Sequence, residues 1–127
     1  MGGASMARIL IIDDSEVMRN LLVDFLTDLG HVVVATGDSL EGIRIAMLEE
    51  FDICFCDLHI PKKSGFEVYC EVSPFKPALQ FVLTDSLPDQ LAEQAKECGV
   101  RYCLRKPFDL SQVREVLSKI LKPINTP

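Results

Sequence analysis

The chain has 127 residues, of which 48% are hydrophobic and 25% charged, as in a single globular domain that buries its own core. Its formal net charge of −6 argues against a nucleic-acid-binding surface, since contacts with phosphates require a basic face. No apolar run approaches the length of a membrane span, and no secretory signal is recognisable before the first predicted strand. We therefore expect a cytoplasmic domain that by itself contacts neither nucleic acid nor a membrane.

Short apolar strands alternate with amphipathic segments of helical periodicity along the whole chain. We expect strands at residues 7–13, 31–36, 51–56, 79–84 and 101–105. We expect helices at residues 15–30, 38–50, 65–72, 88–98 and 109–122. Because the strands are apolar on both faces, they predict a buried parallel sheet with helices on both sides, in the α/β class.

Local signals mark the ends of two predicted helices. Ser15 or Asp14 can cap the first helix. Asp109 and Gln112 have the spacing of a capping box at the start of the last helix, whose end is marked by Pro123. The short and regular connections leave no room for a linker or a second domain between these elements.

The cysteines do not have the spacing of a metal site. None forms a C-x-x-C pair, and neither His31 nor His59 lies near paired cysteines, so zinc is not expected. Their odd number and their apolar surroundings predict reduced, buried thiols, at Cys54, Cys56, Cys70, Cys98 and Cys103.

Polar side chains follow four of the predicted strands. They are Asp13 and Asp14 at the end of the first strand, Asp57 at the end of the third, Thr84 at the end of the fourth and Lys106 just after the fifth. In a parallel sheet these ends meet at one edge, where such folds hold their ligands. Each residue alone has a simpler interpretation: a turn acid, a helix cap, a β-former or a surface lysine. Their joint placement favours a shared site.

This combination of groups suits phosphoryl chemistry. Carboxylates crowded into one crevice repel each other unless a cation joins them, and oxygen ligands favour a hard divalent ion such as Mg²⁺. A lysine and a hydroxyl beside that ion can hold phosphoryl oxygens while one carboxylate acts as nucleophile. One of these carboxylates could therefore accept a phosphoryl group.

The chain resembles the response-regulator receiver domains of bacterial two-component signalling. The resemblance covers residues 7–122 and rests on ordered marks, each after its own strand: Asp13-Asp14, Asp57 with Pro61 and Gly65, Thr84, and Lys106-Pro107-Phe108. It implies a flavodoxin-like (βα)5 fold with strand order 2-1-3-4-5. It leaves residues 1–6 as a leader and residues 123–127 as a C-terminal tail.

The resemblance also implies roles for these residues. Asp57 would take the phosphoryl group from a sensor histidine kinase or a phosphotransfer protein. Asp14, Asp57 and the backbone carbonyl of His59 would bind Mg²⁺ or Mn²⁺ directly, and Asp13 largely through water. Thr84 and Lys106 would contact the phosphoryl oxygens, and the Lys106-Pro107 bond would be cis, with Pro107 as the cis-proline. The positions of His59, Asp85 and Ser86 would tune the reaction rates.

Two residues depart from the family pattern. Receivers usually carry alanine or glycine after the threonine, whereas this chain has Asp85, which we expect to crowd the site and repel the incoming phosphoryl group. The switch aromatic usually lies four residues after a glycine, which places Cys103 there and Tyr102 one residue early. Neighbouring strand residues face opposite sides, so the usual coupling between Thr84 and an aromatic residue is in doubt.

The resemblance makes the protein a signalling phosphoacceptor rather than an enzyme acting on a separate substrate. Output would pass through the face of the fourth helix, fifth strand and fifth helix, to a separate protein or a covalently linked output domain. We expect a monomer or a weak phosphorylation-dependent dimer. Three alternatives stay open: a receiver that binds partners without phosphorylation, an aspartyl-phosphate phosphohydrolase, and a flavodoxin. Where a dehalogenase-type phosphohydrolase needs a second acid, the chain has His59.

Overall fold

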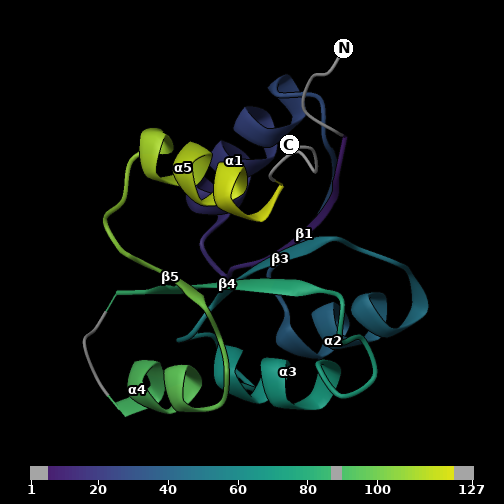
Figure 1. Ribbon diagram of the computed structural model, residues 1–127, viewed down its shortest axis with the longest axis vertical. Helices are drawn as coiled ribbons and strands as arrows, with labels where there is room; N and C mark the ends of the chain where they lie inside the picture. The colour runs from purple at the N-terminus through teal and green to yellow at the C-terminus, as the bar shows by residue number, and fades with distance from the viewer. Residues whose placement is uncertain (1–5, 87–89, 122–127) are drawn as a thin grey trace, which may run out of the picture.

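The computed structural model describes residues 6–86 and 90–121, which form a five-stranded sheet between two layers of helices (Figure 1). The strands are β1 (Arg8–Ile12), β2 (Val32–Thr36), β3 (Ile53–Asp57), β4 (Gln80–Asp85) and β5 (Tyr102–Arg105). The helices are α1 (Glu16–Asp28), α2 (Ser39–Leu48), α3 (Gly65–Val72), α4 (Gln90–Glu97) and α5 (Leu110–Ile120). All strand pairs are parallel, and the order 2-1-3-4-5 confirms the predicted topology.

A separate hydrophobic cluster lies on each face of the sheet, because successive strand residues point to opposite sides. In β1, Ile9 and Ile11 belong to the cluster that α1 and α5 cover. Leu10 and Ile12 belong to the cluster on the side of α2, α3 and α4. Figure 1 shows the same division, with α1 and α5 above the sheet and the other three helices below it. This double cover explains why the inner strands read as continuous apolar runs.

The two edge strands are less buried than the sequence predicted. The expectation that residues 31–36 form a buried strand is wrong for much of the segment, since Val32 is 39% exposed and Ala35 is also exposed. β2 and β5 each have a strand neighbour on one side only. In β5, Cys103 and Arg105 are exposed as well. An apolar run therefore predicts a strand here but not its position in the sheet.

Local capping explains how the chain turns from strand to helix. Ser15 caps α1 and accepts a hydrogen bond from the backbone nitrogen of Met18 at 3.2 Å, so the cap is Ser15 rather than Asp14. Asp109 and Gln112 form the predicted capping box of α5. With Ser15 as the cap, the side chain of Asp14 is not needed for this purpose, and it is exposed at the edge of the sheet.

The cysteine prediction is confirmed at two positions and wrong at three. Cys54 and Cys56 are buried in β3, whereas the exposed cysteines are Cys70, Cys98 and Cys103. Apolar neighbours in the sequence did not predict burial of these three. Cys70 lies on the surface of α3, Cys98 directly after α4, and Cys103 on the edge strand β5.

Some predicted features lie outside the described residues: most of the leader, the helix start at Pro88, the helix end at Pro123 and the tail at 123–127. Within residues 6–86 and 90–121, no helix is both long enough and apolar enough to span a bilayer.

Candidate functional site

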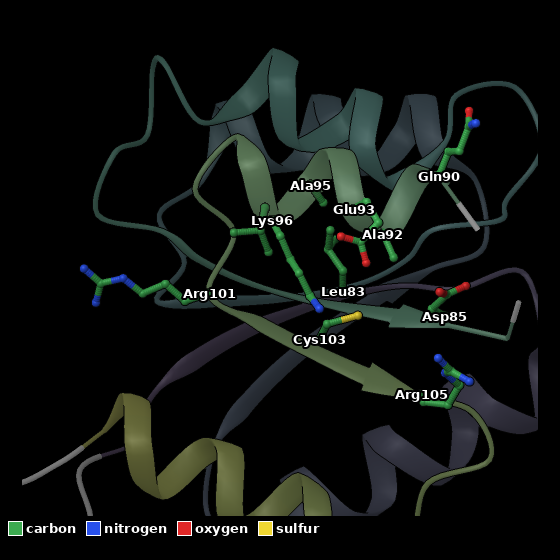
Figure 2. A pocket seen from close by; sticks show the side chains of 11 residues that line it. Leu83, Asp85, Gln90, Ala92, Glu93, Ala95, Lys96, Arg101, Cys103 and Arg105 are labelled. Atoms are coloured by element: carbon green, nitrogen blue, oxygen red, sulfur yellow. The ribbon is translucent and has the colours of Figure 1, made fainter. Parts of the chain in front are cut away.

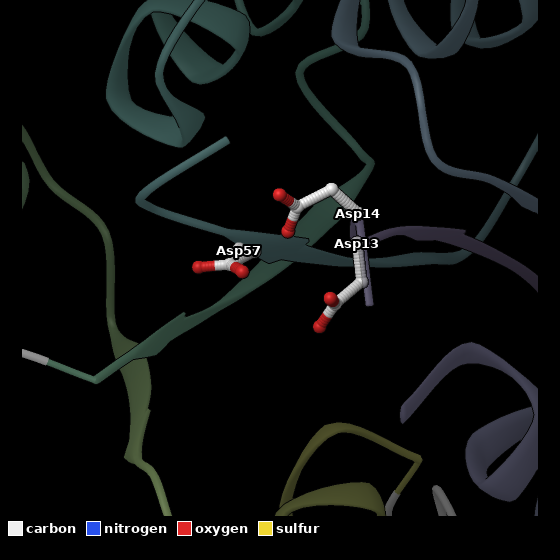
Figure 3. A group of neighbouring side chains, drawn as sticks. All are labelled: Asp13, Asp14 and Asp57. Atoms are coloured by element: carbon white, nitrogen blue, oxygen red, sulfur yellow. The ribbon is translucent and has the colours of Figure 1, made fainter. Parts of the chain in front are cut away.

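The polar residues that follow the strands meet at one edge of the sheet, as the sequence predicted. Asp57 ends β3 and is paired in register with Thr84 of β4. Asp13 and Asp14 follow β1, the other strand neighbour of β3. One possible ligand atom from each of Asp13, Asp14 and Asp57 lies within 4.8 Å of the others, and Figure 3 shows the three carboxylates around this point.

Asp57 is a buried carboxylate that two donors hold. Its side chain is 6% exposed, its Oδ1 accepts a hydrogen bond from the backbone nitrogen of His59 at 2.9 Å, and its Oδ2 lies 3.1 Å from Nζ of Lys106. Burial raises the pKa of Asp57, and the charge of Asp13 adds to this, while the His59 amide and Lys106 act in the opposite direction. Each carboxylate oxygen of Asp57 thus has a donor that fixes its orientation.

Lys106 bridges two of the acids. Its Nζ lies 3.0 Å from Oδ2 of Asp13 and 3.1 Å from Oδ2 of Asp57. Burial by itself lowers the pKa of Lys106, but the two carboxylates outweigh burial, so the pKa lies above its ordinary value. The Lys106-Pro107 peptide bond is cis, which confirms the prediction. Lys106 therefore supplies a positive charge held between the carboxylates of Asp13 and Asp57.

The two adjacent acids after β1 have different environments. The side chain of Asp13 is 4% exposed, and its Oδ1 accepts a hydrogen bond from the backbone nitrogen of Ser15 at 2.9 Å. The side chain of Asp14 is exposed at the same edge. One carboxylate is therefore fixed by the fold, and the other is open to solvent, where it can replace the water ligands of an incoming cation.

Thr84 supplies a buried hydroxyl without a protein partner. Within the described part of the chain, its Oγ1 is buried and makes no hydrogen bond. A buried polar atom without a partner is costly, and such exceptions are often found where a ligand binds. With the acids and Lys106 beside it, the hydroxyl suits a phosphoryl oxygen, so the group as a whole fits a divalent cation and a phosphoryl group.

Gly65 allows α3 to lie close to the end of β3. Its backbone nitrogen donates a hydrogen bond to the carbonyl oxygen of Leu58 at 3.1 Å. A Cβ at this position would lie 2.5 Å from the carbonyl oxygen of Asp57, which no real side chain tolerates. The sequence marked Gly65 by resemblance only, and the structure provides the steric reason.

A side-chain hydrogen bond between His59 and Asp85 was not foreseen from the sequence. His59 Nε2 lies 3.0 Å from Oδ1 of Asp85, whose side chain is 3% exposed. The partners are 26 residues apart, and no spacing rule connects them. The expected repulsion of phosphoryl groups by Asp85 stays a prediction, but this carboxylate has a partner. Ser86, the third tuning position, is exposed just after β4.

Tyr102 and Cys103 face opposite sides of the sheet, as expected for neighbours in a strand. Tyr102 packs against the hydrophobic cluster on the side of α1 and α5. Cys103 lines a cavity of about 620 Å³ between α4 and the strands β4 and β5, together with Leu83 and Lys96. Figure 2 shows the thiol on the floor of this cavity below α4. Whether Tyr102, Cys103 or Thr84 acts as a switch stays a prediction.

Comparison with known proteins places this geometry in context. A family model described as the response regulator receiver domain matches residues 9–118. The transcriptional regulatory protein PdtaR of Mycobacterium tuberculosis is 30% identical over 84% of this chain. The chemotaxis protein CheY of Thermotoga maritima is 29% identical over 91% of this chain and 98% of its own length.

A solved structure of a response regulator from Burkholderia pseudomallei has a TM-score of 0.79 and is 25% identical. The match covers 87% of this chain and 65% of that protein, which was crystallised with a phosphorylated aspartic acid, a calcium ion and citrate. The chain spans only 52% of the length of PdtaR. Some of its relatives thus carry further sequence beyond the matched region.

Proposed function

The chain belongs to the response regulator receiver domain family, and from that premise we propose that Asp57 is its phosphoacceptor in a two-component phosphorelay. The observation that carries the proposal is the position of Asp57. It is buried at the end of β3, held by two donors, and placed next to Lys106 and the unpartnered hydroxyl of Thr84. A turn acid at the surface would need none of these neighbours.

The proposed reaction is a phosphoryl transfer between two side chains. A carboxylate oxygen of Asp57 attacks the phosphorus of a phosphohistidine on the donor protein, and the P–N bond breaks as the P–O bond forms. The electron pair of the broken bond stays on the imidazole nitrogen of the donor. Nζ of Lys106 lies 3.1 Å from Oδ2 of Asp57, and Thr84 is the register partner of Asp57. Both residues are therefore placed to hold the oxygens of the transferred group.

The reaction would need a divalent cation, Mg²⁺ or Mn²⁺, at the three acids. Asp14, Asp57 and the backbone carbonyl of His59 would hold it, with Asp13 acting through water. When bound, the cation neutralises charge on the transferred phosphoryl oxygens. The support is the carboxylate group within 4.8 Å and the calcium ion reported with the phosphorylated relative from Burkholderia pseudomallei.

Partners follow from the same proposal. A sensor histidine kinase or a phosphotransfer protein would supply the phosphoryl group, and phosphorylation would change binding at the face formed by α4, β5 and α5. Output would go to a separate protein or to a covalently linked domain, as in relatives that are longer than this chain. We propose no turnover of a separate substrate, only phosphorylation of Asp57 and its hydrolysis.

Intact mass spectrometry tests the proposal directly. The protein is incubated with acetyl phosphate and Mg²⁺, next to an Asp57→Ala variant and a sample with EDTA. We expect one added phosphoryl group in the wild type, and none in the variant or without the metal. Asp13→Ala keeps the same nucleophile and serves as a second comparison, in which the adduct should form more slowly because the cation is held less well.

A missing adduct would point to the alternative, a receiver that binds its partners without phosphorylation. Asp85 makes a separate explanation testable, because a carboxylate near the site can repel small anionic donors. At saturating Mg²⁺, Asp85→Ala would then be phosphorylated faster than the wild type by acetyl phosphate. An equal or slower rate would show that repulsion by Asp85 does not limit the reaction.

A further inference from the structure

Asp85 and His59 connect two strand ends at the site. Asp57 and Thr84 are register partners, so the residues that follow them leave the sheet side by side. His59 lies in the loop after β3, and Asp85 is the last residue of β4. Their side chains meet at 3.0 Å, from Nε2 to Oδ1, which makes a bridge across the two strand ends.

The bridge is anchored on the side of Asp85. That side chain is 3% exposed, whereas the His59 side chain is 25% exposed. A buried carboxylate needs a donor, and because it only accepts hydrogen bonds the imidazole nitrogen is the donor. The histidine is therefore the more exposed of the two partners, and the buried carboxylate limits where its ring can lie.

Asp85 does not face the phosphoacceptor directly. Together with Leu83, two residues earlier in β4, it lines the cavity under α4, and Figure 2 shows its carboxylate at the edge of that cavity. Thr84 lies between them in the strand and so points to the other face. A contact effect of Asp85 on the site, as distinct from the effect of its charge, would therefore pass through His59.

His59 is the residue through which this effect reaches the site. Its backbone nitrogen donates to Oδ1 of Asp57 at 2.9 Å. In the proposed function its backbone carbonyl is a ligand of the divalent cation. A ring fixed at Nε2 restricts the rotation of the same residue whose amide and carbonyl must point at Asp57 and at the cation.

We propose that Asp85 is a positioning residue for divalent-cation binding, acting by holding the His59 side chain and thereby its backbone carbonyl. The inference rests on the proposed function, since it concerns the same cation. Partners that orient a metal ligand typically change metal affinity by about 10- to 100-fold when removed. Asp85 contacts the side chain of His59 and not the carbonyl oxygen that would bind the cation. We therefore expect the lower end of this range, a loss of cation affinity of about 10-fold.

A purely electrostatic role makes a different prediction. If Asp85 helps only by its negative charge, then Asp85→Ala and Asp85→Asn weaken cation binding equally, and His59→Ala does not weaken it. If Asp85 positions His59, the amide oxygen of Asp85→Asn still accepts the hydrogen bond and preserves affinity. His59→Ala then loses as much cation affinity as Asp85→Ala, although the backbone carbonyl of residue 59 is intact.

The experiment is a Mn²⁺ titration in which electron paramagnetic resonance measures the free ion. The proteins are the wild type, Asp85→Ala, Asp85→Asn, His59→Ala and the double Ala variant. Glu93→Gln, which removes another carboxylate from the cavity that Asp85 lines, is the matched control. We expect dissociation constants about 10-fold higher in Asp85→Ala, His59→Ala and the double variant, and within about twofold of the wild type in Asp85→Asn and Glu93→Gln.

The outcomes separate the inference from the proposed function. Wild-type protein without saturable Mn²⁺ binding would overturn the proposed cation site, and this inference with it. Saturable binding by the wild type with unchanged variants, or with additive losses in the double variant, would overturn the inference alone. His59→Ala removes a partly exposed side chain, so it reports on the bridge even if Asp85→Ala unfolds.

Discussion

The inner strands and the side of α4 and β5 differ in how tightly they are packed. Every residue of β3 is buried, and its last residue is the proposed phosphoacceptor, held by His59 and Lys106. On the other side, α4 buries one of its residues, Ala95, and a cavity of about 620 Å³ separates the helix from Cys103. The proposed reacting groups thus lie on a fully buried part of the sheet, and the face proposed for output is the part with room to rearrange.

The largest effect should come from deleting a side chain in the inner sheet. Phe55 is 1% exposed, so Phe55→Ala leaves a cavity and should lower the free energy of unfolding by about 3–5 kcal/mol. Val32→Ala on the edge strand, where the side chain is 39% exposed, should cost less than about 1 kcal/mol. Urea denaturation measures both, and equal losses would contradict the division into a tight centre and loose edges.

Gly65→Ala should disturb the site as well as the fold. The new Cβ would press on the Asp57 carbonyl oxygen, so we expect a loss of about 1–3 kcal/mol and slower phosphorylation by acetyl phosphate. Gly42→Ala is a matched control, because its Cβ meets the Ile12 side chain instead of the backbone of the site. That control should lose stability but keep the phosphorylation rate. A wild-type phosphorylation rate in Gly65→Ala would contradict the proposal that Gly65 positions the backbone of Asp57.

Asp57→Asn should stabilise the protein at neutral pH. Since burial raises the pKa of Asp57, the folded state holds the proton more tightly than the unfolded state, whose pKa is near 3.8. Protonated Asp57 therefore favours the folded state of the wild type at pH values below 3.8, and this contribution to the free energy of unfolding is lost as the pH rises through the folded-state pKa. Urea denaturation in EDTA at about pH 3 and pH 7 should show an advantage for Asp57→Asn only at the higher pH. An advantage that is equal at both values would refute the assignment.

The smallest effect should come from filling the α4 cavity. Cys103→Leu adds volume where the structure has space, so its free energy of unfolding should stay within about 0.5 kcal/mol of the wild type. Phosphorylation of Asp57 by acetyl phosphate should also be unchanged. A loss above about 1 kcal/mol would show that the cavity is closed in solution and that this side is packed more tightly than described.

Much of the fold and of the site followed from local sequence signals. Apolar runs marked the strands, and Asp13, Asp57, Thr84 and Lys106 were found because parallel strands end at one edge. Exposure was less predictable, since an apolar run such as residues 31–36 does not say whether its strand is central or at the edge. The same limit explains why Cys103 was expected to be buried.

Contacts between residues far apart in the chain were also not predictable from the sequence. The sequence placed Asp85 next to Thr84 and predicted a repulsive charge, but it gave no sign that His59 would hold that carboxylate at 3.0 Å. A pair of residues far apart in the chain is joined only after β3 and β4 have paired in register. The steric need for Gly65 was invisible for the same reason, as it depends on how closely α3 approaches the Asp57 backbone.

Cys103, an exposed residue whose side chain lines the cavity under α4, also gives the protein a chemical reporter of its own. An alkylating reagent can reach it from solvent, and its rate of labelling depends on how far α4 lies from β5. Cys70 and Cys98 are exposed elsewhere and provide reference rates in the same sample, while Cys54 and Cys56 are buried and stay unlabelled in the folded state. Movement of α4 can therefore be followed in the unmodified sequence, without a fluorophore or an introduced cysteine.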